Sequence, residues 1–183
     1  MAQPTTLMTF GHGTADRDEL ARLLQGAHIE RIVDVRRFPG SRRNDAAARG
    51  QIEELAHELG IEYVWDERLG GRRSLSKAED QQSPDQWWRV KAFRAYAAWT
   101  RSEEFRAGMA DLLGGLDDKR TAVMCSESVW WRCHRRIISD VATAKHSVRV
   151  VHLMHNGKFT VHEPSEGLRL DEHGNPVWDG AKA

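Results

Sequence analysis

The stretch that decides the fold is Thr121–Arg136, which reads TAVMCSESVWWRCHRR. It begins with a short apolar run that ends at Cys125, as in a buried strand. A polar and aromatic segment follows, and a Cys133-His134-Arg135 cluster then opens a run with apolar residues at helical spacing. Both cysteines of the chain lie here. We therefore predict a strand, a site loop and a helix N-terminus, in that order.

Strand-like and helix-like segments alternate on both sides of this stretch. Further strands are predicted at 6–10, 29–35, 61–65 and 147–154, and a tight turn at 155–158 leads to a returning strand at 159–162. Helices are predicted after Thr14, at 45–59, from 83 to 97, from Ser102 and behind His134. We expect residues 66–84 to be a long loop. The alternation predicts an α/β fold: a mostly parallel sheet with helices on both faces and a C-terminal β-hairpin.

Composition places few restrictions on the function. The 183 residues fit one domain, which we assign to 1–165, followed by a polar and poorly ordered tail at 166–183. With 27 basic and 27 acidic residues the net charge is near zero, which argues against a strongly basic nucleic-acid coat. We expect a cytoplasmic protein without a membrane span or secretory signal, whose two cysteines are reduced.

Unusual polar loops follow four of the predicted strands. The carboxyl ends of parallel strands meet at one edge of a sheet, where α/β proteins bind their ligands. Arginine forks at such an edge favour phosphate, sulfate or carboxylate groups. Some of these arginines could instead pair with Asp34 or with surface carboxylates. The candidate anion-binding residues are Arg36, Arg37, Arg42, Arg43, Arg72 and Arg135.

Cys125 has two interpretations. Its thiol could be activated by arginines and a helix N-terminus, with His134 or His12 as base and Glu127 as the orienting group. Alternatively it is a small buried residue at a strand end. The spacing does not fit a Cys-x5-Arg phosphatase loop, because Trp131 occupies the arginine position.

A metal site is the less favoured alternative for this stretch. Cys125, Cys133 and His134 could contribute ligands, but Cys-x7-Cys-His is not a zinc-ribbon spacing. We predict no cofactor. Trp130 and Trp131 could form an aromatic wall that stacks on a base or sugar, or they could pack as a lid. Seven other histidines show no motif and are expected to be structural or exposed: His28, His57, His146, His152, His155, His162 and His173.

The motifs taken together resemble the bacterial and archaeal family called domain of unknown function 488. The resemblance covers roughly residues 6–154 and rests on the segments 11–14, 34–42, 69–71, 125–127 and 133–135, in the family's order. One departure is Val129–Arg132, where the family often has a Pro-containing run with shorter side chains. The resemblance implies an α/β fold in which these motifs converge, and it implies no reaction.

Three functions are compatible with these patterns. The first is an enzyme that acts on a nucleotide-like or nucleic-acid substrate, using an arginine-rich cleft and the cysteine, glutamate and histidine cluster. The second is a binding module for nucleic acid or a nucleotide, without catalysis. The third is a metal or redox thiol protein. The expected partner is an anionic small molecule or a nucleic acid, and no membrane.

Overall fold

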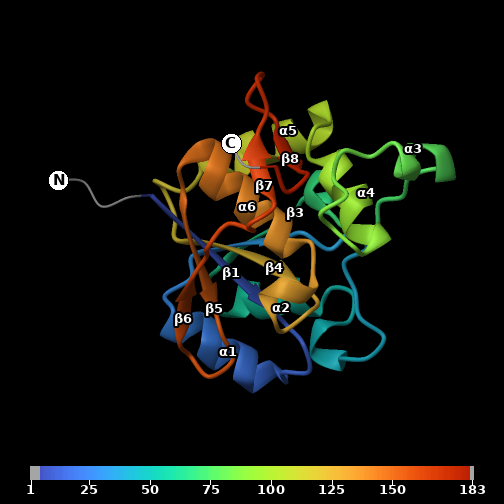
Figure 1. Cartoon of the computed structure of the whole chain (residues 1–183). Coiled ribbons are helices and arrows are strands. Elements are labelled where there is room, and N and C mark those ends of the chain that lie inside the picture. The colour runs from blue at the N-terminus through green and yellow to red at the C-terminus, as the bar shows by residue number, and fades with distance from the viewer. Residues whose placement is uncertain (1–4, 182–183) are drawn as a thin grey trace.

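Strand β4 (Thr121–Cys125) lies in the middle of a six-stranded sheet, and each of its residues is buried. The computed structural model describes residues 5–181 (Figure 1). The strand order is β3-β2-β4-β1-β5-β6, and only β6 runs antiparallel to its neighbour. The predicted α/β fold with a mostly parallel sheet and a hairpin after it is therefore confirmed.

The remaining elements follow in chain order. The strands are β1 (Thr6–Gly11), β2 (Arg31–Asp34), β3 (Glu62–Trp65), β5 (Arg149–Leu153), β6 (Phe159–Val161), β7 (Leu168–Leu170) and β8 (Pro176–Trp178). The α-helices are α1 (Arg17–Gly26), α2 (Gln51–Glu58), α3 (Lys77–Gln81), α4 (Lys91–Trp99), α5 (Glu103–Gly114) and α6 (Arg135–His146). Single 3-10 turns are η1 (Asp45–Ala47), η2 (Glu67–Leu69) and η3 (Trp130–Arg132).

Two apolar cores form because side chains alternate across each strand. Ala122 and Met124 of β4 join the core beneath α1 and α2, on one face of the sheet. Val123 and Cys125 join the other core, beneath α4, α5 and α6. Figure 1 shows the two helical layers on opposite sides of the sheet. Cys125 therefore lies on the α6 side, where Cys133 precedes that helix.

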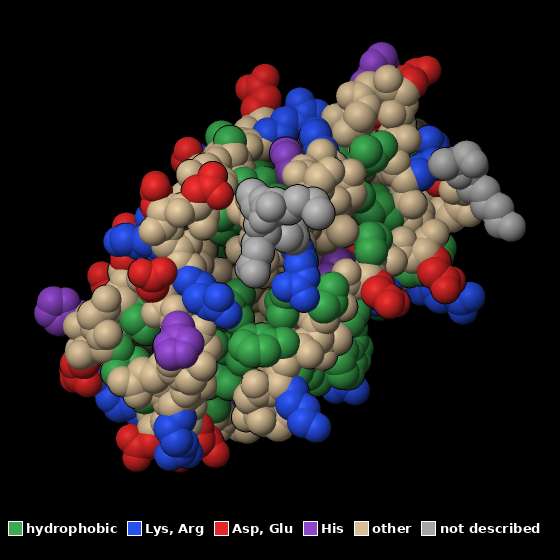
Figure 2. Space-filling model, turned by 90° about the vertical axis from the view of Figure 1, so that its left-hand side faces the viewer, with side chains coloured by type: hydrophobic (Ala, Val, Ile, Leu, Met, Phe, Trp, Pro, Cys, Tyr) green, Lys and Arg blue, Asp and Glu red, His purple; other side chains and the backbone are tan. Residues whose placement is uncertain are grey.

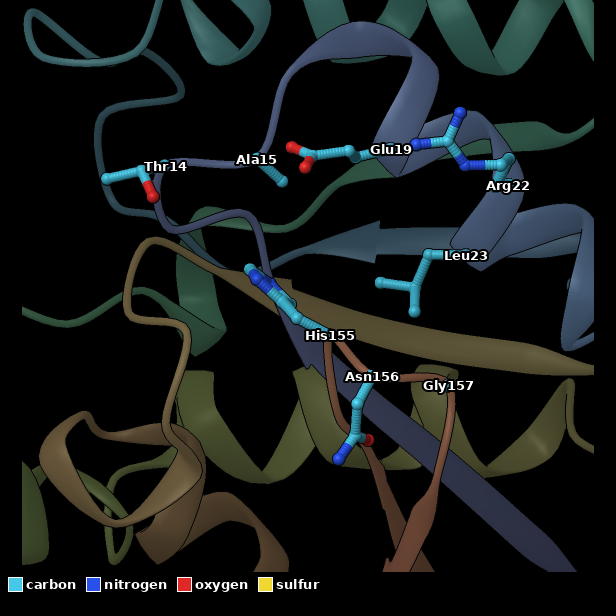
Figure 3. Close-up of a pocket in the computed structure, with 8 residues that line it drawn as sticks. All are labelled: Thr14, Ala15, Glu19, Arg22, Leu23, His155, Asn156 and Gly157. Atoms are coloured by element: carbon cyan, nitrogen blue, oxygen red, sulfur yellow. The ribbon is translucent and has the colours of Figure 1, made fainter.

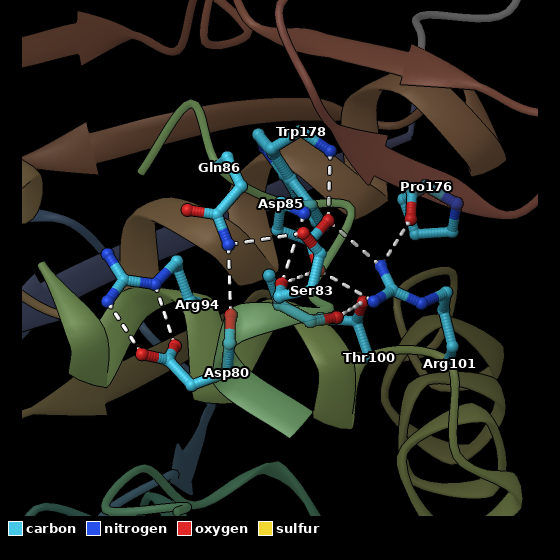
Figure 4. A network of polar contacts seen from close by, with 10 residues as sticks. Asp80, Ser83, Asp85, Gln86, Arg94, Thr100, Arg101, Pro176 and Trp178 are labelled. Atoms are coloured by element: carbon cyan, nitrogen blue, oxygen red, sulfur yellow. Dashed lines mark hydrogen bonds and ion pairs between the residues drawn. The ribbon is translucent and has the colours of Figure 1, made fainter. Parts of the chain in front are cut away.

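Two predicted helices differ from the observed ones. The helix expected at 45–59 is divided into η1 and α2 at Gly50, whose φ of 83° is left-handed and interrupts the helical hydrogen bonds. The helix expected from residue 83 begins only at Lys91. Asp85, which the pattern suggested as part of that helix, instead accepts hydrogen bonds from Trp178 and Arg101 (Figure 4). The long loop at 66–84 contains η2 and α3.

The prediction of a poorly ordered tail from residue 166 was wrong for the part that the structure describes. Residues 168–178 form the β7–β8 hairpin, and Trp178 is fully buried in the α6 core. The buried carboxylate of Asp85 accepts the Trp178 backbone N–H at 3.0 Å, and it pairs with Arg101 at 2.6 Å. Arg101 also donates to the Pro176 carbonyl (Figure 4). The polar composition of this segment gave no sign that Trp178 is buried and fixes the hairpin to the core. Residues 182 and 183 of the predicted tail lie outside the described part.

The surface shows no single charge over a wide area in the view of Figure 2. Acidic, basic and apolar side chains are interspersed on this side of the molecule, which carries β6. Between residues 5 and 181, no helix combines the length and the apolar character needed to cross a bilayer.

Candidate functional site

Three predicted site loops meet at the carboxyl ends of β1, β2 and β4. The parallel register places Gly11 beside Cys125. The His12 N–H donates to the Cys125 carbonyl at 3.1 Å, and the Val35 N–H donates to the Met124 carbonyl at 3.0 Å. Gly11 is required here, because a Cβ would lie 1.5 Å from the Glu127 carbonyl oxygen. The loop after β4 therefore folds back tightly over the end of β1.

The two thiols lie together beneath this loop. The Sγ atoms of Cys125 and Cys133 are 2.7 Å apart, and the side chains have exposed fractions of 1% and 7%. Cys125 ends a central strand, and Cys133 immediately precedes His134, the N-cap of α6. Both are therefore held by rigid secondary structure, although eight positions separate them in the sequence.

Arg135 is buried beside the thiols and has no carboxylate partner among residues 5–181. Its exposed fraction is 1%. One guanidinium nitrogen donates to the Glu127 carbonyl at 2.9 Å, another lies 3.4 Å from the Thr9 hydroxyl, and Nε is buried without a partner. An uncompensated buried cation is costly, so neighbouring groups respond to it.

The charge of Arg135 lowers the pKa of both thiols, but the net shifts of the two pKa values are opposite. Burial raises the pKa of Cys133, but the hydrogen bond from Cys125 and the charge of Arg135 outweigh burial and lower this pKa to about 7. Burial, followed by the hydrogen bond with Cys133, raises the pKa of Cys125 well above its ordinary value. The pKa of Cys133 therefore lies below that of Cys125, and Cys133 is the more readily ionised of the two thiols.

Among residues 5–181, no hydrogen bond joins either proposed general base to a sulfur atom. Nε2 of His134 is 2.8 Å from the Val35 carbonyl, which can only accept, so this nitrogen carries the proton. The ring packs against Tyr96 and Gly71, and burial lowers its pKa to about 4. His12 lies over the Gly13 carbonyl with a buried Nε2 that has no partner, and burial lowers its pKa too.

Glu127 contributes its backbone rather than its side chain. Its carbonyl accepts a hydrogen bond from Arg135 and lies 3.8 Å from the Cys125 sulfur, whereas its side chain is exposed. Within residues 5–181 no hydrogen bond joins its carboxylate to His12 or His134. The structure brings the backbone of this predicted site together and leaves the predicted acid–base side chains separate.

The six predicted anion-binding arginines fall into different environments. Arg36 is buried and bonds to Asp34 at 2.7 Å, to the Ala47 carbonyl and, through Asp34, to Tyr63. Arg135 faces the thiols. Arg42 and Arg43 are exposed on the loop before η1. Arg37 and Arg72 both lie near the exposed Phe38 ring, with Cζ atoms 5.5 and 5.9 Å from its centroid.

A groove lined by Arg37, Arg73 and Trp99 has a volume of about 470 Å³, and we call it the arginine groove. Arg37 donates to the Arg72 carbonyl at 2.7 Å, and its Nε is buried without a partner. Arg73 donates to the carbonyls of Gly70 and Glu67 and lies 3.8 Å above the Trp99 ring. In the described chain neither guanidinium has a carboxylate within ion-pair distance. Burial, and then the charge of Arg37, lowers the pKa of Arg73.

The predicted aromatic wall is divided. The Trp130 ring is stacked on His152, with centroids 4.5 Å apart and planes at 5°, so it serves as a cover for the interior. Trp131 is 45% exposed and stands nearly perpendicular to Trp130. Of these two tryptophans, only Trp131 presents a largely exposed ring to solvent.

A chain of buried polar groups begins at Arg135 and was not predicted from the sequence. Thr9 Oγ1 is 2.6 Å from His152 Nδ1, His152 Nε2 is 2.9 Å from His162 Nδ1, and His162 Nε2 is 2.7 Å from Asp140. Asp140 also accepts from the Trp178 indole and the Ser165 N–H. His152 interrupts the apolar run of β5, and a polar residue within a buried strand needs a partner. That interruption was the available signal.

Another cavity lies between the start of α1 and the turn after β5, and Figure 3 shows its lining residues. Its volume is about 390 Å³, and Glu19, Arg22, His155 and Asn156 contribute polar groups. His155 Nε2 is 2.6 Å from the Gly11 carbonyl, so its ring supports the end of β1. The cavity contains neither thiol.

The three possible metal ligands do not converge. Cys125 and Cys133 are adjacent, but His134 directs Nε2 to the Val35 carbonyl. Within the described residues no group of three or more His, Cys, Asp or Glu side chains is arranged to hold a metal ion.

Comparison with known proteins identifies the family. Neither the curated proteins nor the solved structures contain a match to the chain. The family model "Domain of unknown function DUF488" matches residues 16–142, which include the site loops after β2 and β4. The match covers more than half of the chain, and the chain therefore belongs to the DUF488 family.

Proposed function

We propose that this protein binds a phosphorylated, nucleotide-like anion in the arginine groove. The observation that carries the proposal is that Arg37 and Arg73 lie close together without carboxylate partners among the described residues. Like charges repel, and an anion with several oxygens would relieve this repulsion while accepting the remaining N–H groups.

The dimensions of the groove support a small ligand. A volume of about 470 Å³ falls within the range of roughly 300–1,000 Å³ that is typical of small-molecule sites. A near-zero net charge argues against a strongly basic surface that would hold a long nucleic-acid strand. A nucleotide or another phosphorylated small molecule is therefore favoured over a long nucleic acid.

Binding is favoured over catalysis by the predicted cysteine, glutamate and histidine cluster. That catalytic role would need Cys125, Glu127 and His134 to act together, whereas each side chain has separate contacts. The two adjacent thiols instead suit redox chemistry, which does not involve the arginine groove.

Calorimetric titration with ADP at low salt tests the proposal. Wild-type protein should bind ADP saturably, and binding should weaken with salt as phosphate contacts are screened. Arg73→Gln should weaken binding by about 10-fold or more, since a hydrogen bond to a charged group contributes roughly 1.5–3 kcal/mol. Binding should also change Trp99 fluorescence, because Arg73 covers this ring.

Arg149→Gln is the matched control. Arg149 is an exposed arginine at the opposite, amino-terminal end of β5, so its loss removes the same charge away from the groove. ADP affinity should stay within about twofold of wild type, as expected for a remote surface charge. Equal weakening by both substitutions, or no saturable binding of ADP, AMP or inorganic phosphate to wild-type protein, would contradict the proposal.

A further inference from the structure

We propose that Cys133 and Cys125 form a redox-active dithiol that reduces a small hydroperoxide and closes to a reversible disulfide. Cys133 would be the attacking sulfur and Cys125 the resolving one. The inference rests on the two adjacent thiols and on the buried Arg135, and it holds whether or not the arginine groove binds an anion.

The position of the sulfur atoms is the first argument. A separation of 2.7 Å between two Sγ atoms brings the thiols into direct contact before any reaction. A disulfide requires the two Cβ groups to face each other at short range, so little movement of β4 or α6 is needed to close one. Two cysteines that served only as small core residues would not need to meet.

The environment of Arg135 is the second argument and is independent of the first. Its guanidinium is buried, its Nε has no partner, and the described residues offer it no carboxylate. A thiolate at Cys133 would supply the missing negative charge, and Arg135 lies close enough to hydrogen-bond this sulfur. The site is therefore arranged for an anionic sulfur.

Access distinguishes the two cysteines. Cys133 has an exposed fraction of 7%, compared with 1% for Cys125. The segment 126–132 covers both, and its Trp131 and Arg132 side chains are exposed. A small hydroperoxide would reach Cys133 first, whereas bulky reagents would be excluded. The residue with the larger exposed fraction is also the one whose thiol pKa is lowered overall.

The reaction balances without another reagent. The Cys133 thiolate attacks the terminal oxygen of the hydroperoxide; an S–O bond forms, the O–O bond breaks, and the departing alkoxide takes up a proton to become an alcohol. The Cys125 sulfur then attacks the resulting sulfenic acid; the S–S bond forms and hydroxide leaves with the Cys125 proton as water. The two thiols lose two electrons, and the hydroperoxide is reduced to an alcohol and water.

The intact mass of folded wild-type protein after treatment with tert-butyl hydroperoxide tests the proposal. The expected product has lost the mass of two hydrogen atoms, no longer reacts with maleimide after unfolding, and recovers both thiols with dithiothreitol. Two free thiols after treatment, or a disulfide only between two chains, would overturn the proposal. This measurement needs no variant and is unaffected by folding defects.

Variants then assign the two roles. Cys125→Ser should stop at the sulfenic acid of Cys133, which dimedone would trap, whereas Cys133→Ser should lose the reaction. Ser126→Ala is the control, since it changes an exposed side chain in the same loop and should react like wild type. Dimedone labelling of Cys133→Ser at the rate seen for Cys125→Ser would overturn the assignment of the attacking sulfur.

Discussion

Arg36 and Arg135 are both buried near the ends of the central strands, but their charges are balanced differently. Arg36 bonds directly to Asp34 through several nitrogens, and Tyr63 donates to the same carboxylate. Arg135 is more deeply buried, with an exposed fraction of 1% against 5%, and in the described chain no carboxylate pairs with it. The charge of Arg36 is balanced by Asp34, so this pair serves the stability of the fold. The charge of Arg135 is not balanced by any carboxylate in residues 5–181 and can act on another group.

Arg135 is nevertheless connected to a carboxylate through a chain of polar groups. Asp140 can only accept, so His162 donates to it, His152 donates to His162, and the Thr9 hydroxyl donates to His152. In this assignment, which takes His162 Nδ1 as the acceptor, every donor points away from Arg135 and towards Asp140. The chain orients dipoles in the interior and holds Arg135 in place without neutralising it.

Removal of the direct partner should have the largest effect on stability. Asp34→Asn leaves Arg36 buried without its counter-charge and weakens the Tyr63 hydrogen bond. We expect the free energy of unfolding to fall by about 3–5 kcal/mol, as for other broken buried ion pairs. Urea denaturation measures the change.

Glu58→Gln is the control for this experiment. It breaks the ion pair between Glu58 and Arg17, whose side chains are 56% and 34% exposed, respectively. Its cost should be under about 1 kcal/mol. A comparably small loss in Asp34→Asn would show that Arg36 does not depend on its carboxylate.

Removal of the distant partner should have a smaller effect, because Asp140 accepts from a histidine, an indole and a backbone N–H rather than from an arginine. Asp140→Asn disrupts the bonds to His162 and the Trp178 indole, with an expected cost of roughly 2–3 kcal/mol. Thermal or urea unfolding measures it, and near-ultraviolet circular dichroism reports on Trp178. Asp117→Asn, at an exposed aspartate, should have no measurable effect. Stability of Asp140→Asn equal to that of this control would contradict the relayed support of Arg135.

The contrast between the two arginines explains how far the sequence could predict the molecule. The alternation of strands and helices, and the strand-to-helix transition at Cys125 and His134, depend on local pattern and were recovered. Arg36 and Arg37 are adjacent and identical in type, yet one lies in a buried ion pair and the other in the arginine groove. The environment of each arginine depends on the residues that the fold brings near it. The periodicity of the sequence carries no information about these partners.

The same limit applies to the thiols and the C-terminal hairpin. Cys125 and Cys133 meet because β4 and α6 enclose a tight loop, a geometry that the cysteine spacing alone does not determine. Trp178 is anchored by Asp85, more than ninety positions earlier in the chain. The contact of Arg73 with Trp99 joins two segments that are distant in the sequence, so no local pattern predicts it.

Mild acid offers a way to disturb the support of Arg135 selectively. Burial, and then the charges of His162 and Arg135, lowers the pKa of His152 to about 2. The unfolded chain therefore binds a proton below about pH 6.5 that folded His152 does not, and stability falls as the pH drops. His152→Gln removes this group, so the stability difference between wild type and this variant should shrink by about 1–2 kcal/mol from pH 6.5 to 5. A constant difference across this range would contradict a buried neutral His152.

The smallest expected effect tests the charge that Arg135 retains. Because the pKa of Cys133 is lowered to about 7 in the folded protein, the thiolate stabilises the fold above the unfolded pKa of about 8.5, and this contribution is lost as the pH falls through 7. Between pH 7 and 8 the wild type should gain less than about 1 kcal/mol relative to Cys133→Ser, which has no titrating group at this position. Urea unfolding at the two pH values measures the gain, and thiolate absorbance should follow the same titration. An absorbance change centred above about pH 8.5 would show that Arg135 does not stabilise a thiolate. Arg36 and Arg135 would then differ in their contacts, but neither would change the chemistry of a neighbouring group.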